Sequence, residues 1–103
     1  MPRNYSDKFL YELSQANSDR LGVRLGRLCV EMNIPASYVA VALKTSRMTI
    51  YSWFRGRGVS ENKRALVETF IRLVEDDAKV GMLPAKNMVD AKNYIQEMLG
   101  VSI

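Results

Sequence analysis

The sequence predicts an all-α fold, a bundle of five or six helices that forms one domain over residues 1–103. Apolar residues recur at intervals of three and four positions along most of the chain, which is the period of an amphipathic helix. Alternation of apolar and polar residues, the pattern of a strand, never extends beyond three or four residues. A chain of 103 residues is long enough for one hydrophobic core and too short for two.

The first helix is expected to begin after Ser6 and Asp7, because a serine hydroxyl can accept a hydrogen bond from a free backbone N–H of the first turn. It should end near Asn17, and Ser18 or Asp19 should then cap a second helix. The apolar residues of these helices are Phe9, Leu10 and Leu13 in the first and Leu21, Leu25, Leu28 and Met32 in the second.

Two glycines, Gly22 and Gly26, lie inside the second helix, where each costs about 1 kcal/mol relative to alanine. Because they are four residues apart they share one face, and we expect another helix to approach closely there. Asn33 is expected to end this helix. Three arginines on the other side are expected to form a solvated face, with contact to the flank of a bound duplex as an alternative for the last of them: Arg20, Arg24 and Arg27.

The middle of the chain, about residues 35–56, is expected to form two short helices joined by a tight turn. Pro35 fits the first turn of one helix, the chain breaks at Lys44–Thr45, and Thr45 or Ser46 caps the next helix, which ends in the sequence RGRG. In DNA-binding proteins, two short helices joined in this way place an exposed helix in the major groove. The core-facing residues are expected to be Val39, Ala40 and Leu43 in the first helix and Ile50, Trp53 and Phe54 in the second.

Two further helices are expected at about residues 61–77 and 85–99, with Gly81 and Pro84 between them. The last helix is a candidate for the contact between two subunits, and the alternative is that it packs on the core of its own subunit. The apolar residues expected to face inward are Leu66, Phe70, Leu73 and Val74 in the first of these helices and Met88, Ala91, Ile95, Met98 and Leu99 in the second.

The composition argues against several classes of protein. No apolar run approaches the roughly 18 residues that span a bilayer, and no secretory signal is evident, so we expect a cytoplasmic protein, associated with the nucleoid or located in a host cell if a phage encodes it. With no histidine and one cysteine, Cys29, the chain lacks a Cys/His zinc site and the commonest general base. We therefore expect no metal, no cofactor and no enzymatic activity.

The positive charge is concentrated in the middle of the chain. Residues 35–64 contain six Lys or Arg and one Asp or Glu, whereas the preceding segment has a net charge of +1 and the following segment a net charge of −2. Localised basicity of this kind is the electrostatic signature of a surface that binds phosphates. The charge pattern therefore favours a nucleic acid as the partner.

The segment ASYVAVALKTSRMTIYSWFRG, residues 36–56, resembles the helix-turn-helix of the Cro and lambda-repressor-like (XRE) family. Ala40 matches the small residue at the helix crossing, and Ile50 and Trp53 match apolar core positions of the recognition helix. With its flanking helices the resemblance covers roughly residues 19–77. It implies a lambda-repressor-like bundle and a sequence-specific regulator of transcription, a repressor of the kind common in phages and mobile elements, that binds double-stranded DNA.

The sequence departs from the family pattern at two positions. Lys44 occupies the place in the turn where the family commonly has glycine, so either this lysine takes a left-handed backbone conformation or the turn differs in detail. Ala36 occupies the place of a glutamine that often binds phosphate, so that side-chain contact is absent.

The resemblance also implies which side chains face DNA, with residues 46–54 as the recognition helix. Arg47 can offer two donors to guanine, while Met48 or Thr49 can contact a thymine methyl group. Simpler interpretations remain for Met48, which could be partly buried, and for Tyr51, which could pack on the surface. The base-reading candidates are Ser46, Arg47, Met48, Thr49, Tyr51 and Ser52, and the phosphate-binding candidates are Ser37, Tyr38, Arg55, Arg57 and Lys63, of which Arg57 and Lys63 are alternatively ordinary solvated charges.

The resemblance implies a homodimer, because family members pair so that two recognition helices lie about 34 Å apart on DNA. A different class of function stays open: a protein-interaction module, antitoxin-like or an adaptor, that binds a protein partner with secondary or no DNA binding. An excisionase or MerR-like fold is a second rival. It expects a β-hairpin after the recognition helix, whereas this chain continues into a helical pattern.

Overall fold

The computed structural model describes residues 5–17 and 19–100, and in this part of the chain the fold is all-α, as predicted. No helix in these residues is long and apolar enough to cross a membrane. The proposed cap Ser18 lies outside the described residues, and Asp19 does not cap the second helix, which starts one residue after Arg20. The helices are α1 (Asp7–Gln15), α2 (Leu21–Glu31), α3 (Ala36–Ala42), α4 (Arg47–Phe54), α5 (Glu61–Lys79) and α6 (Met88–Leu99).

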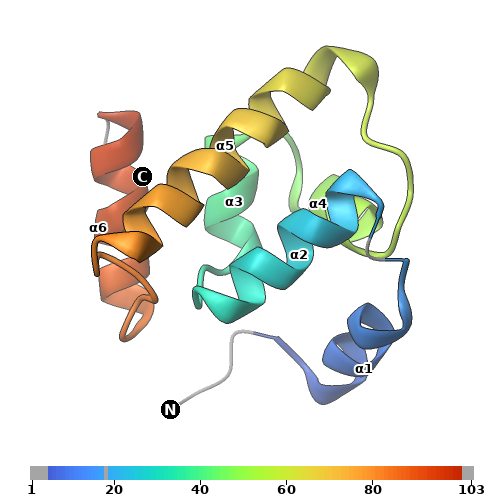
Figure 1. Ribbon diagram of the computed structural model, residues 1–103, viewed down its shortest axis with the longest axis horizontal. Helices are drawn as coiled ribbons and strands as arrows, with labels where there is room; N and C mark the ends of the chain where they lie inside the picture. The colour runs from blue at the N-terminus through green and yellow to red at the C-terminus, as the bar shows by residue number, and fades with distance from the viewer. Residues whose placement is uncertain (1–4, 18, 101–103) are drawn as a thin grey trace.

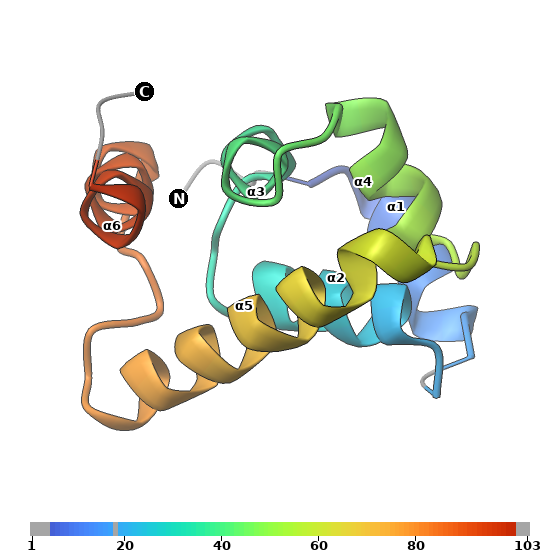
Figure 2. The same ribbon diagram turned by 90° about the horizontal axis from the view of Figure 1, so that it is seen from above.

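Helix α2 lies at the centre of the bundle, with α4 and α5 packed against it and α3 between α4 and α6 (Figure 1). Seen from above, α4 and α1 lie at one end of the molecule and α6 at the other (Figure 2). The start of α1 and the end of α2 lie at the residues that the sequence predicts. Ser6 accepts a hydrogen bond from Phe9 N at the start of α1, and Asn33, with a φ of 59°, ends α2.

The close approach expected at the two glycines of α2 is confirmed, and α4 is the helix that approaches. A Cβ atom at Gly22 would lie 2.3 Å from the backbone oxygen of Trp53, and one at Gly26 would lie 3.0 Å from the ring of Phe54. At Gly22 any side chain would overlap the backbone of α4, whereas at Gly26 the neighbouring side chains would have to shift by a few tenths of an ångström. The cost in helix propensity is offset by the tight packing that the two glycines allow.

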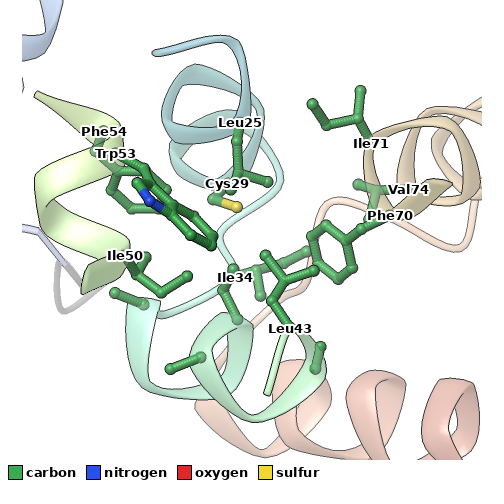
Figure 3. Close-up of a cluster of buried hydrophobic side chains, with 14 of the residues drawn as sticks. Leu25, Cys29, Ile34, Leu43, Ile50, Trp53, Phe54, Phe70, Ile71 and Val74 are labelled. Atoms are coloured by element: carbon green, nitrogen blue, oxygen red, sulfur yellow. The ribbon is translucent and has the colours of Figure 1, made fainter. Parts of the chain in front are cut away.

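The core contains the side chains expected from α3 and α4 together with Leu25, Cys29 and Ile34 (Figure 3). The indole of Trp53 and the ring of Phe54 lie beside α2. Leu43, at the end of α3, and Ile50 of α4 are also buried in this core. Burial raises the pKa of the Cys29 thiol because the thiolate would lose its hydration, so this cysteine acts as a small apolar residue.

The inward face of α5 differs from the prediction. Phe70 and Val74 are buried as expected, whereas Leu66 and Leu73 are 36 % and 43 % exposed. Their places in the core are taken by other members of the same helix, since the buried stripe follows the spacing i, i+3, i+4 and i+7. The buried residues of α5 are Val67, Phe70, Ile71 and Val74.

The last helix begins three residues later than expected, at Met88, with Asn87 as its N-cap. Ala85 is not helical. It joins the α2–α3 turn, because its N–H donates to Met32 O at 2.9 Å and its carbonyl accepts from Asn33 Nδ2 at 2.9 Å. The expectation that Met88 faces inward is wrong, since its side chain is 50 % exposed at the start of the helix.

Part of α6 belongs to the hydrophobic core that the other helices form. Ala91, Tyr94 and Ile95 are buried, Met98 and Leu99 are half-buried, and the hydroxyl of Tyr94 donates to Asp77 Oδ2 of α5 at 2.5 Å. Helix α6 is therefore an integral part of the bundle.

Candidate nucleic-acid interface

The turn between α3 and α4 is built from backbone hydrogen bonds and two caps. Lys44 has a φ of 56°, so the left-handed alternative holds at the place where the resembling family has glycine. The N–H of Thr45 donates to Ala40 O at 3.0 Å and that of Lys44 donates to Val41 O at 3.3 Å, which is the Schellman pattern at a helix end. The left-handed conformation costs lysine about 1–2 kcal/mol. The surrounding hydrogen bonds hold it in place.

Helix α4 starts at the predicted cap. The hydroxyl of Ser46 accepts from Thr49 N at 3.1 Å and donates to Thr49 Oγ1 at 2.9 Å. Ser46 is thus the N-cap, rather than Thr45. Both Ser46 and Thr49 are base-reading candidates, and here their hydroxyl groups take part in the N-cap of α4.

The two faces of α4 differ sharply. Ile50, Trp53 and Phe54 are buried against α2 and α3, as expected. The other face carries exposed Arg47 and Met48, and the side chain of Met48 is 81 % exposed, so the alternative of a partly buried methionine is wrong. We define the outer face of α4 as Arg47, Met48, Ser52 and Arg55, of which Ser52 is half-buried and the others are exposed.

Tyr51 lies between these faces and packs against α1. Its ring makes edge contacts with Phe9 and Phe54, at centroid distances of 5.2 and 5.9 Å, and with Tyr5 at 6.3 Å. The Tyr5 hydroxyl donates to Ile34 O at 2.6 Å, and burial raises its pKa because the phenolate would lose its hydration. These ring contacts support the alternative in which Tyr51 packs against neighbouring side chains. Sequence reasoning missed this aromatic cluster.

An open groove of about 590 Å³ separates the beginning of α1 from the outer face of α4. It lies at the end of the molecule where α4 and α1 are adjacent (Figure 2). Two arginines line it on the side of α4, and the aromatic rings of Phe9 and Tyr51 line it from α1 and α4. The residues that line it are Ser6, Phe9, Arg47, Met48, Tyr51, Ser52 and Arg55.

The predicted phosphate-binding residues differ in their exposure to solvent and in their hydrogen-bond partners. Arg55 Nε lies 3.3 Å from Glu12 Oε2 of α1, and Arg57 is exposed in the loop after α4. Lys63 Nζ donates to Leu43 O and Lys44 O, at 3.1 Å each, so this ammonium caps the end of α3 and is not an ordinary solvated charge. Of the two candidates in the first turn of α3, Ser37 and Tyr38 are both half-buried.

Three arginines at the start and along α2 are exposed, as predicted: Arg20, Arg24 and Arg27. One of them also holds α1. Arg27 Nη2 donates to Leu13 O at 3.3 Å and to Ala16 O at 3.2 Å, so its side chain satisfies carbonyl groups at the end of α1.

Comparison with known proteins adds no relative to this description. A scan against protein-family models gives no match, and searches of curated proteins and of solved structures return no significant match either.

Proposed function

We propose that this protein is a sequence-specific regulator of transcription that binds double-stranded DNA through a lambda-repressor-like helix-turn-helix, with α4 as the recognition helix. The observation that carries the proposal is the division of α4 into two faces. Its inner face is fixed in the core by Ile50, Trp53 and Phe54, while Arg47 and Met48 are exposed on the other face. A rigid helix that presents hydrogen-bond donors and an apolar side chain matches what the major groove offers.

The outer face has the chemistry for base recognition. Arg47 can form two hydrogen bonds with O6 and N7 of guanine, and Met48 can contact the methyl group of thymine. Ser52 can donate or accept, and it lines the same groove as both residues. Thr49 contributes a hydroxyl whose hydrogen is free to donate while its oxygen accepts from Ser46.

Phosphate contacts would fix the position of the protein on DNA without reading its sequence. Arg55 and Arg57 follow the recognition helix and are exposed, and Ser37 and Tyr38 lie at the start of α3. Lys63 still has a third hydrogen to donate beyond its two carbonyl acceptors. All five residues belong to the basic segment of the sequence, residues 35–64.

We further propose that two copies pair so that their recognition helices meet successive turns of the major groove. The support is a set of exposed apolar side chains at the end of the molecule formed by α6 and the end of α5, which we call the apolar end: Val80, Met82, Met88 and Val89. Pairing of this kind suits a repressor that occupies a palindromic operator.

Selection of bound fragments from random DNA duplexes tests the proposal. We expect enrichment of a palindromic motif, because two identical recognition helices related by a two-fold axis read the same bases in opposite directions. Enrichment of a motif without symmetry would support base reading and contradict pairing. No enrichment would favour the rival function, an adaptor or antitoxin-like module that binds a protein and contacts DNA secondarily or not at all.

A further inference from the structure

Glu12 is a carboxylate of α1 that contacts Arg55, one of the residues that line the groove. Its Oε2 lies 3.3 Å from Nε of Arg55, although the two residues are 43 positions apart in the sequence. The contact joins α1 to the residue that ends α4. An anionic group is thus already present at a guanidinium that faces the proposed DNA surface.

The fold keeps this carboxylate in place by anchoring α1 on both sides of it. Before α1, the Tyr5 hydroxyl donates to Ile34 O at 2.6 Å. At its other end, Arg27 donates to the carbonyls of Leu13 and Ala16. Phe9, one turn before Glu12, packs its ring against Tyr51 and Phe54. These contacts hold the helix on which Glu12 lies, so its Cα is kept near Arg55 on the side of α1.

The ion pair leaves part of Arg55 open to a second anion. Its contact with Glu12 uses Nε, and arginine has five N–H donors, four of them on its two terminal nitrogens. The Arg55 side chain is 57 % exposed, so these nitrogens can be reached from solvent. A phosphate bound there would lie close to the carboxylate, and two like charges at short distance repel each other.

We propose that Glu12 is a built-in competitor for the DNA phosphate that Arg55 binds. The inference rests on the proposed function. When DNA arrives, a phosphodiester displaces the carboxylate from Arg55 or binds beside it against its repulsion, so Glu12 lowers the affinity for every duplex. Since phosphates are the same in all sequences, Glu12 leaves the ratio of specific to random binding unchanged. Its effect is to shorten the time the protein spends on any duplex, specific or random.

Substitution of Glu12 by glutamine tests this role, with Glu97→Gln as the matched control. Both changes remove one negative charge, and Glu97 is an exposed residue of α6, at the opposite end of the molecule from α4 (Figure 2). Binding to a short mixed-sequence duplex is measured at several salt concentrations, and thermal melts confirm that both variants are folded. Glu12→Gln should bind about 1.5-fold to fivefold more tightly than the wild type, the range expected for one exposed ion pair.

If Glu12 competes for Arg55, the tighter DNA binding of Glu12→Gln must depend on Arg55. In an Arg55→Gln background, adding Glu12→Gln should change the affinity little, because the group for which carboxylate and phosphate compete is gone. The salt dependence of log K should become steeper in Glu12→Gln by at most about one unit, since one further phosphate contact is made without competition.

Three results would overturn the inference. The first is an equal gain in Glu12→Gln and Glu97→Gln, which would show a general charge effect. The second is a gain that persists without Arg55. The third is weaker binding by Glu12→Gln, which would show that the carboxylate orients Arg55 toward phosphate. If neither the wild type nor Glu12→Gln binds any duplex, the proposed function itself fails and the inference fails with it. Wild-type binding with one of the first three results refutes the inference alone.

Discussion

The two ends of the molecule are both built from short amphipathic helices, yet their exposed surfaces have opposite character. At one end, the outer face of α4 presents two arginines, a methionine and a serine beside an open groove. At the other end, four large apolar side chains are exposed. Hydrogen-bond donors suit a nucleic acid, whereas an apolar surface suits a second protein surface. The comparison supports a division of labour, with DNA at α4 and a second copy at α6.

The first way to break this comparison is to move α4 itself. Gly22→Ala should lower the free energy of unfolding by about 3 kcal/mol, because the new methyl group would overlap the backbone of Trp53 and a helix cannot shift as a side-chain tip can. Denaturant unfolding measures the loss. Gly58→Ala is the matched control, since nothing lies within 4 Å of a Cβ there. Equal stability of the two variants would contradict the packing of α4 on α2.

This contact also shows what the sequence could predict. The spacing of Gly22 and Gly26 on one helical face is by itself enough to indicate a close neighbour, and the N-caps at Ser6 and Ser46 follow from local hydrogen-bond chemistry. Such features depend on residues within about one helical turn. Local rules are therefore enough to place these helices and their contact faces.

Features that join distant segments were missed or misplaced. Tyr5 and Tyr51 meet in the aromatic cluster although 46 positions separate them, and nothing in the local pattern pairs them. The capping of α3 by Lys63 is of the same kind. In α5, apolar residues occur on more than one helical stripe, so periodicity alone could not exclude Leu66 and Leu73. The neighbouring helices decide which stripe is buried, and their positions follow only from the complete fold.

The outer face of α4 is tested by its exposed arginine. Arg47→Ala should weaken binding to the selected operator by about 1–3 kcal/mol and binding to random duplexes far less, because a bidentate contact to guanine is lost. Titration of both duplexes at one salt concentration measures the difference. Arg72→Ala, at an exposed arginine of α5 outside the basic segment, is a control of equal charge. Equal losses on both duplexes would show that Arg47 binds phosphate and reads no base.

The apolar end is tested by a charge placed on α6. Val89 is 68 % exposed, and Val89→Lys should raise the dissociation constant of the dimer about tenfold or more, because an ammonium would have to be buried in the contact. Sedimentation over a range of concentrations measures it. Removing α6 is the wrong test, since Ala91 and Ile95 belong to the core and their loss would unfold the chain.

Gln15→Lys serves as the control for this charge. Gln15 is polar and exposed in α1, at the end of the molecule opposite α6 (Figure 2). Unchanged association in Gln15→Lys together with loss of dimer in Val89→Lys would assign the contact to the apolar end. A dimer that survives both substitutions would place the subunit contact elsewhere, and the division of labour between the two ends would then be wrong.

The smallest expected effect belongs to Arg57, which lies beyond α4 and is exposed. Arg57→Gln should weaken binding to specific and random duplexes alike by about 1 kcal/mol or less, because a phosphate contact carries no sequence information. The decisive measurement is the salt dependence, which should fall by about one unit of slope when one counterion fewer is released. Arg72→Gln, an exposed arginine of α5, should leave the slope unchanged. If Arg57→Gln also leaves it unchanged, Arg57 is an ordinary solvated charge and makes no phosphate contact.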